Sequence, residues 1–386
     1  MKSQVVGILK ELFYRCFCFI NRIVPKDEKL IFFYDSKLMR QNCWALFRYL
    51  VENKYSNYKI VYFSNSKPNT ENEEENVVFT GSFFRGAWYH LRAKYTFFEY
   101  DNFKFVCTAS RGQVNFNLWH GMPLKRIGYL SGACPKHEYK RDFNYLLVTS
   151  KFFVNIMEEC FGSDHKQIFI GGYPRNDQLF VRKELYPSYS KEYKNIIWMP
   201  TFRKSTQNSF SDSNQDFPLL NQDNIVDFNK FLGKNKYNLL IKLHPFQDNI
   251  SWLSDFKLTN INIIRNEDIF NKGYELYEVL GQADILLTDY SSVYFDYLLL
   301  NRPVIFVFDD IDEYRSNRGF TVENPLSLMP GPIVDNFEKL KVSLENLANG
   351  IDNYSSEREK ICSLVNEKHS GFSSSILNFL DIRKDK

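Results

Sequence analysis

The sequence predicts an α/β protein built on parallel sheets, and two observations support this fold class. Short continuous apolar runs alternate with amphipathic or loop segments along most of the chain after Lys26. Such runs are typical of parallel strands that are buried on both faces. The chain has 386 residues, which corresponds to about two domains of ~100–200 residues each. We therefore expect two Rossmann-like domains that face each other across a cleft.

The composition is that of an ordinary globular protein, with 44% hydrophobic and 25% charged residues. The net charge is only +3 and no long basic stripe is present, which argues against nucleic-acid binding. The seven cysteines are odd in number and scattered along the chain. This pattern indicates reduced thiols in a cytosolic compartment rather than a disulfide framework or a zinc site.

The first element predicted is an amphipathic helix that ends before Pro25. Apolar residues follow helical spacing from Val5 to Ile23, whereas Arg15 and Arg22 fall on the other side. No run of ~18 uncharged apolar residues exists, so no membrane-spanning helix is expected, and the internal charges argue against a secretory signal. Two interpretations stay open: the helix packs on the protein's own core, or it lies on a membrane surface.

The apolar runs place the expected strands in two series. They are Leu30–Tyr34, Lys59–Phe63, Tyr95–Glu99, Val114–Leu118, Tyr145–Val148 and Ile168–Ile170, then Ile196–Met199, Leu239–Leu243, Ile261–Ile264, Ile285–Leu287 and Val304–Phe308. A stretch of low hydrophobicity, Glu184–Lys194, separates the series and is the predicted linker. The expected parts are the N-terminal helix at 1–27, two domains at 28–185 and 186–350, and a helical C-terminal segment at 351–386.

Five short polar motifs each follow a predicted strand or lie at its end. They are Trp119–Lys125, Gly172–Asp177, Pro200–Arg203, Lys242–Pro245 and Thr288–Ser292. The carboxyl ends of strands are where ligands bind in open α/β sheets. Because the motifs come from both halves, the predicted site is the cleft between the domains.

Two histidines are candidates for proton transfer. His120 precedes Gly121, which allows a tight turn and close approach of a substrate, and imidazole suits a general base near neutral pH. Lys125 lies one short loop further on and could contact a phosphate. His244 is held at a strand end by Pro245 and could bind a phosphate or assist a leaving group. For both histidines, a purely structural role is the alternative.

The Thr288–Ser292 turn is the strongest candidate for an anion site. A helix start with unpaired backbone N–H groups and serine hydroxyls suits a phosphate, although ordinary capping is the alternative. Arg203 follows another strand and has a guanidinium suited to bidentate phosphate contact. Arg318 is a further candidate phosphate ligand. Asp289 has no evident role, because a carboxylate beside a phosphate is repulsive.

Several motifs of other protein classes are missing from the sequence. There is no Gly-x-Gly-x-x-Gly or Walker-type loop, which argues against a nicotinamide oxidoreductase or a P-loop ATPase. No Asp-x-Asp pair is flanked by strands, which argues against nucleotide-sugar transferases that hold a metal in this way. The sequence therefore requires no metal or cofactor.

Taken in order, the motifs resemble the CDP-glycerol glycerophosphotransferase family, whose members prime or polymerise teichoic acids and related polyol phosphate chains. The matching segments cover most of the chain. They are Asn117–Lys125, Gly172–Asp177, Pro200–Arg203, Asp284–Phe320 and Pro330–Ile333.

The resemblance implies a GT-B fold. It also implies transfer of a polyol phosphate, with glycerol phosphate favoured over other polyol phosphates, from a CDP-linked donor to a hydroxyl of a lipid-linked glycan or teichoic-acid-type acceptor. The domain 28–185 would then bind the acceptor and 186–350 the donor. The family's catalytic histidines carry over to His120 and His244, and its pyrophosphate-binding serines to Ser291 and Ser292.

The remaining candidates of the cleft are Trp119, Gly121, Arg175, Asn176, Asp177 and Asp289. This chain departs from the family pattern at Met122, where Thr is usual, and its His244 segment matches loosely. The lipid-linked acceptor favours the membrane interpretation of the N-terminal helix and a peripheral position on the inner face of the cell membrane. Two alternatives remain: a GT-B glycosyltransferase that uses a nucleotide sugar, and a non-catalytic component of an envelope-polymer assembly complex.

Overall fold

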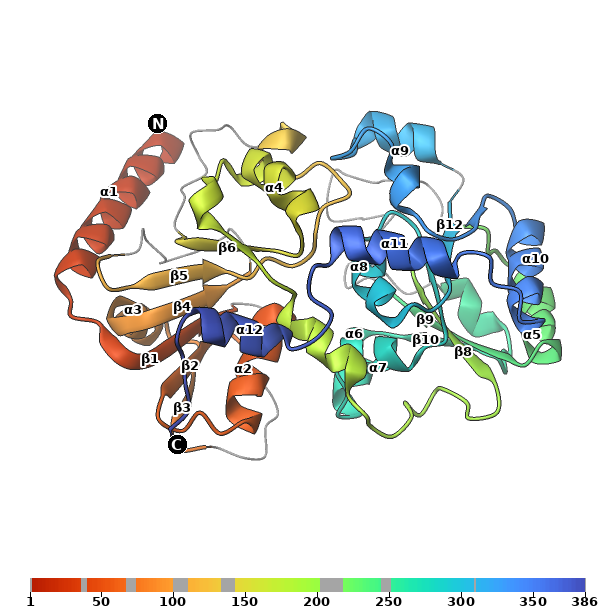
Figure 1. The fold of residues 1–386 in the computed structure, drawn as a ribbon, viewed down its shortest axis with the longest axis horizontal. Helices are drawn as coiled ribbons and strands as arrows, with labels where there is room; N and C mark the ends of the chain where they lie inside the picture. Colours follow the sequence, from red (N-terminus) through yellow and green to blue (C-terminus); the bar gives the residue numbers. More distant parts are fainter. Residues whose placement is uncertain are drawn as a thin grey trace. The chain divides into compact units, whose positions relative to one another are not determined.

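The computed structural model describes residues 2–35, 40–66, 74–99, 110–132, 143–201, 218–243, 251–308 and 310–385. The chain forms two compact units, each around one parallel sheet, whose elements are labelled in Figure 1. The first unit comprises Met1–Gly121, Gly132–Asp177 and Glu367–Lys386. The second comprises Met122–Ser131 and Gln178–Asn366. The chain therefore changes unit several times.

Within the described residues, the first unit has a seven-stranded sheet in the order β3-β2-β1-β4-β5-β6-β7. The strands are β1 (Asp27–Tyr34), β2 (Lys59–Phe63), β3 (Val77–Thr80), β4 (Ala93–Phe98), β5 (Val114–Asn117), β6 (Tyr145–Val148) and β7 (Ile168–Ile170). The direction of strand succession reverses between β1 and β4. This reversal is the topological switch point of a Rossmann-type sheet, where ligands bind beyond the carboxyl ends of the strands.

The sheet described in the second unit has six strands and repeats the same arrangement, in the order β10-β9-β8-β11-β12-β13. The strands are β8 (Lys194–Met199), β9 (Tyr237–Lys242), β10 (Ile261–Ile264), β11 (Ile285–Thr288), β12 (Val304–Val307) and β13 (Ile333–Val334). Its switch point lies between β8 and β11.

The α/β class and the predicted strands are confirmed, with small differences at the strand ends. Two short edge strands, β3 and β13, were not predicted. β3 is only half-buried along most of its length, and β13 has two residues. β3 has a run of only three apolar residues, Val77 to Phe79, and β13 is too short to show a pattern.

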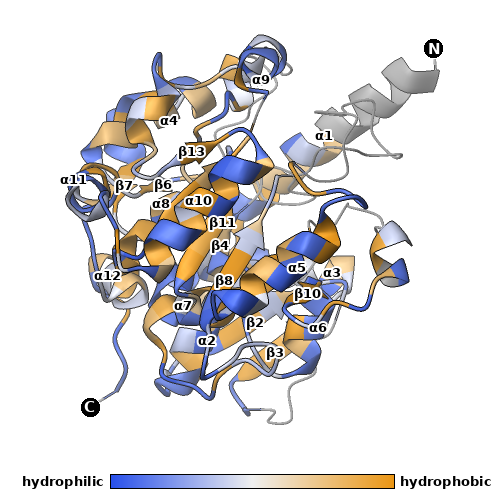
Figure 2. Ribbon diagram, turned by 90° about the vertical axis from the view of Figure 1, so that its right-hand side faces the viewer, coloured by the Kyte–Doolittle hydropathy of each residue, from blue (hydrophilic) through white to orange (hydrophobic). Residues whose placement is uncertain are grey.

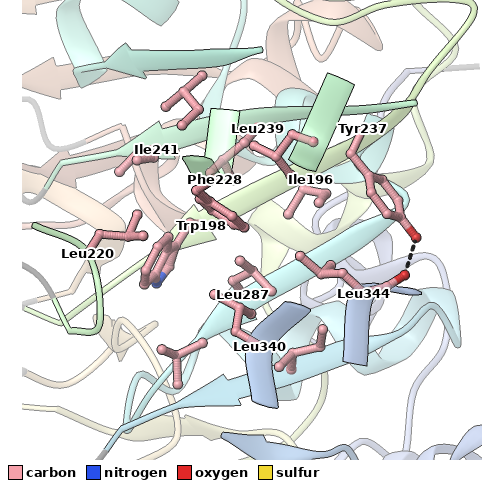
Figure 3. Close-up of a cluster of buried hydrophobic side chains, with 14 of the residues drawn as sticks. Ile196, Trp198, Leu220, Phe228, Tyr237, Leu239, Ile241, Leu287, Leu340 and Leu344 are labelled. Carbon is pink, nitrogen blue, oxygen red and sulfur yellow. Dashed lines mark hydrogen bonds between the residues drawn. The ribbon is translucent and has the colours of Figure 1, made fainter. Parts of the chain in front are cut away.

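One face of the second sheet packs on helices α5 (Ile225–Lys234) and α10 (Phe337–Ala348). Figure 3 shows the resulting core, in which Trp198 and Phe228 lie among aliphatic side chains. The hydroxyl of Tyr237 donates to the Leu344 carbonyl at 2.9 Å, which satisfies the polar end of this buried ring. Both helices carry alternating apolar and polar bands in Figure 2, as expected for helices that cover one face of a sheet.

The C-terminal segment is helical and divides between the units. Helix α11 (Ser355–Val365) belongs to the second unit, and α12 (Phe372–Phe379) belongs to the first. The Phe379 ring packs 4.4 Å from Phe169 of β7 and 4.9 Å from Tyr145 of β6, measured between centroids. The last helix therefore completes the core of the unit in which the chain begins.

The N-terminal helix α1 (Lys2–Ile23) has two distinct faces, described here from Leu12 onward. On one face Phe17 is buried, and the Asn21 side chain donates to the side-chain Oε1 of Gln113 at 2.8 Å. On the other face Leu12, Phe19 and Ile23 are 58%, 63% and 65% exposed. Among the described residues, no helix combines the length and the apolar character that crossing a membrane requires.

Candidate functional site

The turn after β5 carries His120 and is held by side-chain to backbone hydrogen bonds. The Asn117 side chain accepts from the Trp119 N–H at 2.9 Å, and the Asn42 amide donates to the Trp119 carbonyl at 2.7 Å. Trp119 has a φ of 48°, which is unusual for a residue with a large side chain, and Gly121 has a φ of 152°. Such backbone geometry persists only where the surroundings enforce it and is frequent at functional sites.

His120 is oriented by a backbone carbonyl and an aromatic ring. Its Nδ1 lies 3.3 Å from the Glu99 carbonyl oxygen, and its ring lies 3.9 Å from the Trp119 ring between centroids. Because a carbonyl can only accept, Nδ1 carries the hydrogen and Nε2 is the proton-accepting nitrogen. Burial lowers the pKa of His120 to about 4; the hydrogen bond from Nδ1 opposes this shift, and the charge of Arg175 adds to it. The imidazole is therefore neutral at pH 7.

Arg175 holds the backbone of the His120 turn in place. It belongs to the 3₁₀ turn Pro174–Phe180, and its guanidinium donates to the His120 carbonyl at 2.9 Å and to Gln41 Oε1 at 2.6 Å. Asn176, the next residue, is fully buried. Asp177 has a different place, because its carboxylate accepts from the first backbone N–H groups of α12, those of Phe372 at 3.0 Å and Ser373 at 2.8 Å.

Two buried carboxylates that the sequence analysis overlooked lie at the switch point of the first unit. Asp35 follows β1 and accepts from the Tyr62 hydroxyl at 2.8 Å. Glu99 follows β4, and its Oε1 accepts from the Cys43 N–H, whereas its Oε2 has no hydrogen-bond partner among the described residues. Burial and the charge of Asp35 raise the pKa of Glu99 to about 8, so Glu99 is mostly protonated at pH 7. Asp35 directly follows the predicted strand Leu30–Tyr34, and Glu99 ends the predicted strand Tyr95–Glu99, so the search for polar residues at strand ends could have found both.

At the switch point of the second unit, Asp289 binds the end of the neighbouring strand. Its two carboxylate oxygens lie 3.1 and 2.9 Å from the Thr201 N–H nitrogen, and the Thr201 hydroxyl donates to it at 2.8 Å. Asp289 is fully buried. Its carboxylate therefore joins the chain after β11 to the chain after β8. This structural contact gives Asp289 the role that its sequence position left open.

The serines of the same turn have a different environment. Ser291 and Ser292 are half-buried, and the Ser292 side chain makes no capping hydrogen bond to helix α8 (Val293–Tyr297). Thr288 is buried, and its hydroxyl donates to the Met199 carbonyl at 3.0 Å. The threonine therefore stabilises the sheet edge, whereas the serine hydroxyls are not used as helix caps.

Lys125 and the Arg318 loop lie in the second unit together with this turn. Leu124 accepts from the Thr321 N–H at 2.9 Å, and the Lys125 Nζ lies 5.3 Å from the centre of the Tyr314 ring. Tyr314 stacks on Tyr290 at 4.1 Å. Arg318 is exposed at the end of helix α9 (Ile311–Asn317). Lys125 and the serine turn therefore belong to the same unit, which is not the unit of His120.

Two candidates, Arg203 and His244, lie outside the described residues, as does the polar stretch Lys204–Asp216. The described chain reaches Thr201 and Leu243, directly before them. Their predicted roles stay predictions.

Two Rossmann-type units with polar groups at the carboxyl edges of their sheets define a GT-B-like fold. The structure is similar to that of the wall teichoic acid polymerase TagF, with a TM-score of 0.71 and 21% identity over 98% of this chain and 95% of that chain. The family model described as CDP-glycerol:poly(glycerophosphate) glycerophosphotransferase matches residues 16–379. The chain belongs to this family, as its motifs predicted, and it is a transferase.

Curated relatives agree with this assignment. The chain is 29% identical to a teichoic acid poly(glycerol phosphate) polymerase of Bacillus spizizenii, over 90% of this chain and 92% of the relative. It is 26% identical to a teichoic acid glycerol-phosphate transferase of Staphylococcus aureus, over 94% of this chain and 96% of the relative. It also matches a poly(ribitol-phosphate) polymerase of B. spizizenii at 30% identity, but the match covers only 41% of that protein.

Proposed function

We propose that this protein transfers glycerol phosphate from CDP-glycerol to a hydroxyl of a lipid-linked, teichoic-acid-type acceptor and releases CMP. Family membership supports the donor and the class of acceptor. The observation that carries the proposal is the neutral, oriented imidazole of His120 at the carboxyl edge of the first sheet.

In this reaction the acceptor hydroxyl gives its proton to Nε2 of His120 while its oxygen attacks the β-phosphorus of the donor. The bond between the β-phosphorus and the bridging oxygen breaks, and CMP leaves with that oxygen. The Nδ1–H bond to the Glu99 carbonyl stabilises the imidazolium that forms. Trp119 and Arg175 act as positioning residues, because they fix the ring and the backbone of His120.

The second unit supplies the groups that hold the donor. The hydroxyls of Ser291 and Ser292 and the charges of Lys125 and Arg318 would bind the pyrophosphate. Phosphoryl transfer depends mainly on positioning and on neutralising charge, so such groups account for much of the catalysis.

Release of CMP from CDP-glycerol by wild-type protein and by His120→Gln, with a lipid-linked acceptor, tests the function. We expect His120→Gln to lose a factor of ~10²–10⁴ in rate if general-base catalysis is the main loss. His369→Gln is the matched control, because His369 is an exposed histidine of the same unit. Wild-type protein that releases no CMP from CDP-glycerol or CDP-ribitol, but releases nucleotide from a nucleotide sugar, would establish the glycosyltransferase alternative instead.

The proposal includes contact with the inner face of the cell membrane, where a lipid-linked acceptor would be met. Besides the outer face of α1, helix α3 (Phe83–Arg92) exposes Phe84 and Trp88, at 83% and 54%. The Phe83 ring lies 6.3 Å from Phe13 of α1, so the two helices are neighbours. Exposed apolar side chains accompanied by arginines such as Arg85 are typical of interfacial helices.

Cosedimentation with phosphatidylglycerol vesicles tests this contact. The double variant Phe19→Glu/Ile23→Glu changes the outer face of α1 and leaves the packed face intact, so it should lose vesicle binding. Val342→Glu is the control, because Val342 is 54% exposed on α10 of the other unit and should bind as wild type. Equal binding by the double variant would exclude α1 as the membrane contact.

A further inference from the structure

Lys242, the last residue of β9, is a buried lysine without a counter-charge among the described residues. Its exposed fraction is 7%, and burial is the sole cause that lowers its pKa, to about 8. No described carboxylate forms an ion pair with it. By contrast, the buried Arg358 is held by Asp352 at 2.5 Å.

The position of Lys242 in the sheet indicates which face its side chain occupies. Ile241 and Leu243, its neighbours in the chain, belong to the core under α5 and α10. Because side chains alternate along a strand, Lys242 lies on the opposite face. Thr288 lies on that face too, since Leu287 belongs to the same core.

The strand register places Lys242 close to the serine turn. Ile241 pairs with Trp198, and Met199 pairs with Thr288. Lys242, Met199 and Thr288 therefore form one row across three adjacent strands, at the carboxyl edge of the sheet. Thr288 begins the turn that carries Ser291 and Ser292.

An ammonium group loses hydration when it is buried, and this cost is offset only by an opposite charge or by hydrogen bonds. A lysine whose stem merely packs would place its charged end in water. Only 7% of the surface of Lys242 is exposed, so water can hydrate its ammonium group over a small area at most. An anionic ligand at the carboxyl edge of the sheet would supply the missing counter-charge.

We propose that Lys242 is a further ligand of the donor, binding its diphosphate from the β9 side of the serine turn. The assignment rests on the proposed function, because it takes the donor to be a CDP-linked molecule. It gives a role to the first residue of the Lys242–Pro245 motif, for which the sequence analysis assigned a role only to His244.

Titration calorimetry with CDP, CMP and cytidine tests the proposal on wild type, Lys242→Met, Lys242→Arg and Lys234→Met. We expect Lys242→Met to weaken CDP binding by about 10- to 100-fold, the loss typical of one charged hydrogen bond. Cytidine binding should stay unchanged, and Lys242→Arg should recover part of the CDP affinity. Lys234 is exposed on α5, so Lys234→Met controls for the loss of one positive charge.

The unliganded proteins give a second readout. Removing an unpaired buried charge should leave Lys242→Met at least as resistant to urea as wild type. A variant that unfolds more easily yet binds CDP normally would show that the ammonium is paired within the protein, and the proposal would be wrong. Loss of cytidine affinity to the same degree would also overturn it. If wild-type protein does not bind CDP at all, the proposed function itself fails.

Discussion

The contact between Asp289 and Thr201 gives the sharpest test of how the second unit is organised. Thr201→Val keeps the shape of the side chain and removes the hydroxyl that donates to Asp289 at 2.8 Å. Asp289→Asn keeps the shape of the acid and replaces the charged acceptor by an amide with one acceptor oxygen. The two single variants and the double variant form a thermodynamic cycle with the wild type.

The expected magnitude follows from burial. Asp289 is fully buried and accepts from both the backbone and the side chain of Thr201. A hydrogen bond to a charged group contributes ~1.5–3 kcal/mol, and removing one partner leaves the other unsatisfied. We therefore expect each single variant to lower the free energy of unfolding by ~1.5–3 kcal/mol. Since both remove the same bond, the double variant should lose ~1–2 kcal/mol less than the sum.

Urea titration of the four proteins measures the cycle, with Asp227→Asn as the control. Asp227 is exposed on α5 and pairs with Lys230 at the surface, so its loss should change stability by no more than ~0.5 kcal/mol. Additive losses for Thr201 and Asp289, within ~0.5 kcal/mol, would refute the contact. A rise in KM for CDP-glycerol in Asp289→Asn would show that the contact also positions the donor site.

Three further predictions concern proton uptake and backbone geometry. Because the pKa of His120 is lowered to about 4, the imidazole stays unprotonated in mildly acidic solution, and kcat/KM should fall only as the pH approaches that value. A pH profile of kcat/KM with its midpoint near 6.5 would contradict this. The pKa of Glu99 is raised from 4.5 to about 8, so the folded state holds an extra proton between these values and stability should fall as pH rises. The slope is at most ~1.4 kcal/mol per pH unit; Glu99→Gln should remove it in urea titrations, and an unchanged slope would refute the assignment. Gly319 has a φ of 67°, and an added Cβ would lie 2.9 Å from the Arg126 side chain, so Gly319→Ala should lower the melting temperature more than Gly350→Ala, where φ is 78° and no atom lies within 4 Å.

The strands could be predicted from the sequence because parallel strands buried on both faces need continuous apolar runs. The runs at Ile196–Met199 and Ile285–Leu287 therefore marked β8 and β11 to within two residues. The rule marks Val77–Thr80 less clearly, because this half-buried edge strand has only three consecutive apolar residues and follows an acidic stretch. Short edge strands need less burial, so their sequences carry a weaker signal.

The site could be predicted only as a set of positions at strand ends. Nothing local in the sequence indicates that Lys125, five residues after His120, belongs to the other unit, because its contacts are with Tyr314 and the loop near Thr321. The partner of Asp289 is equally remote, since Thr201 lies 88 residues earlier in the chain. Such pairings are set by the order of strands in the sheet, which the local pattern does not encode.

The two switch points show how one architecture can serve two chemical tasks. In the second unit, the N–H and hydroxyl of Thr201 satisfy the carboxylate of Asp289, and Lys242 contributes a buried positive charge in the row that contains Thr288. Under the proposed function, this edge binds the diphosphate of the donor. In the first unit, Glu99 is mostly protonated at pH 7 and the His120 imidazole is neutral, so this edge retains a nitrogen that can accept a proton. Under the proposed function, the hydroxyl acceptor needs the neutral base of the first unit, and the diphosphate donor needs the positive charge of the second. The difference arises from the residues that follow equivalent strands rather than from the fold itself.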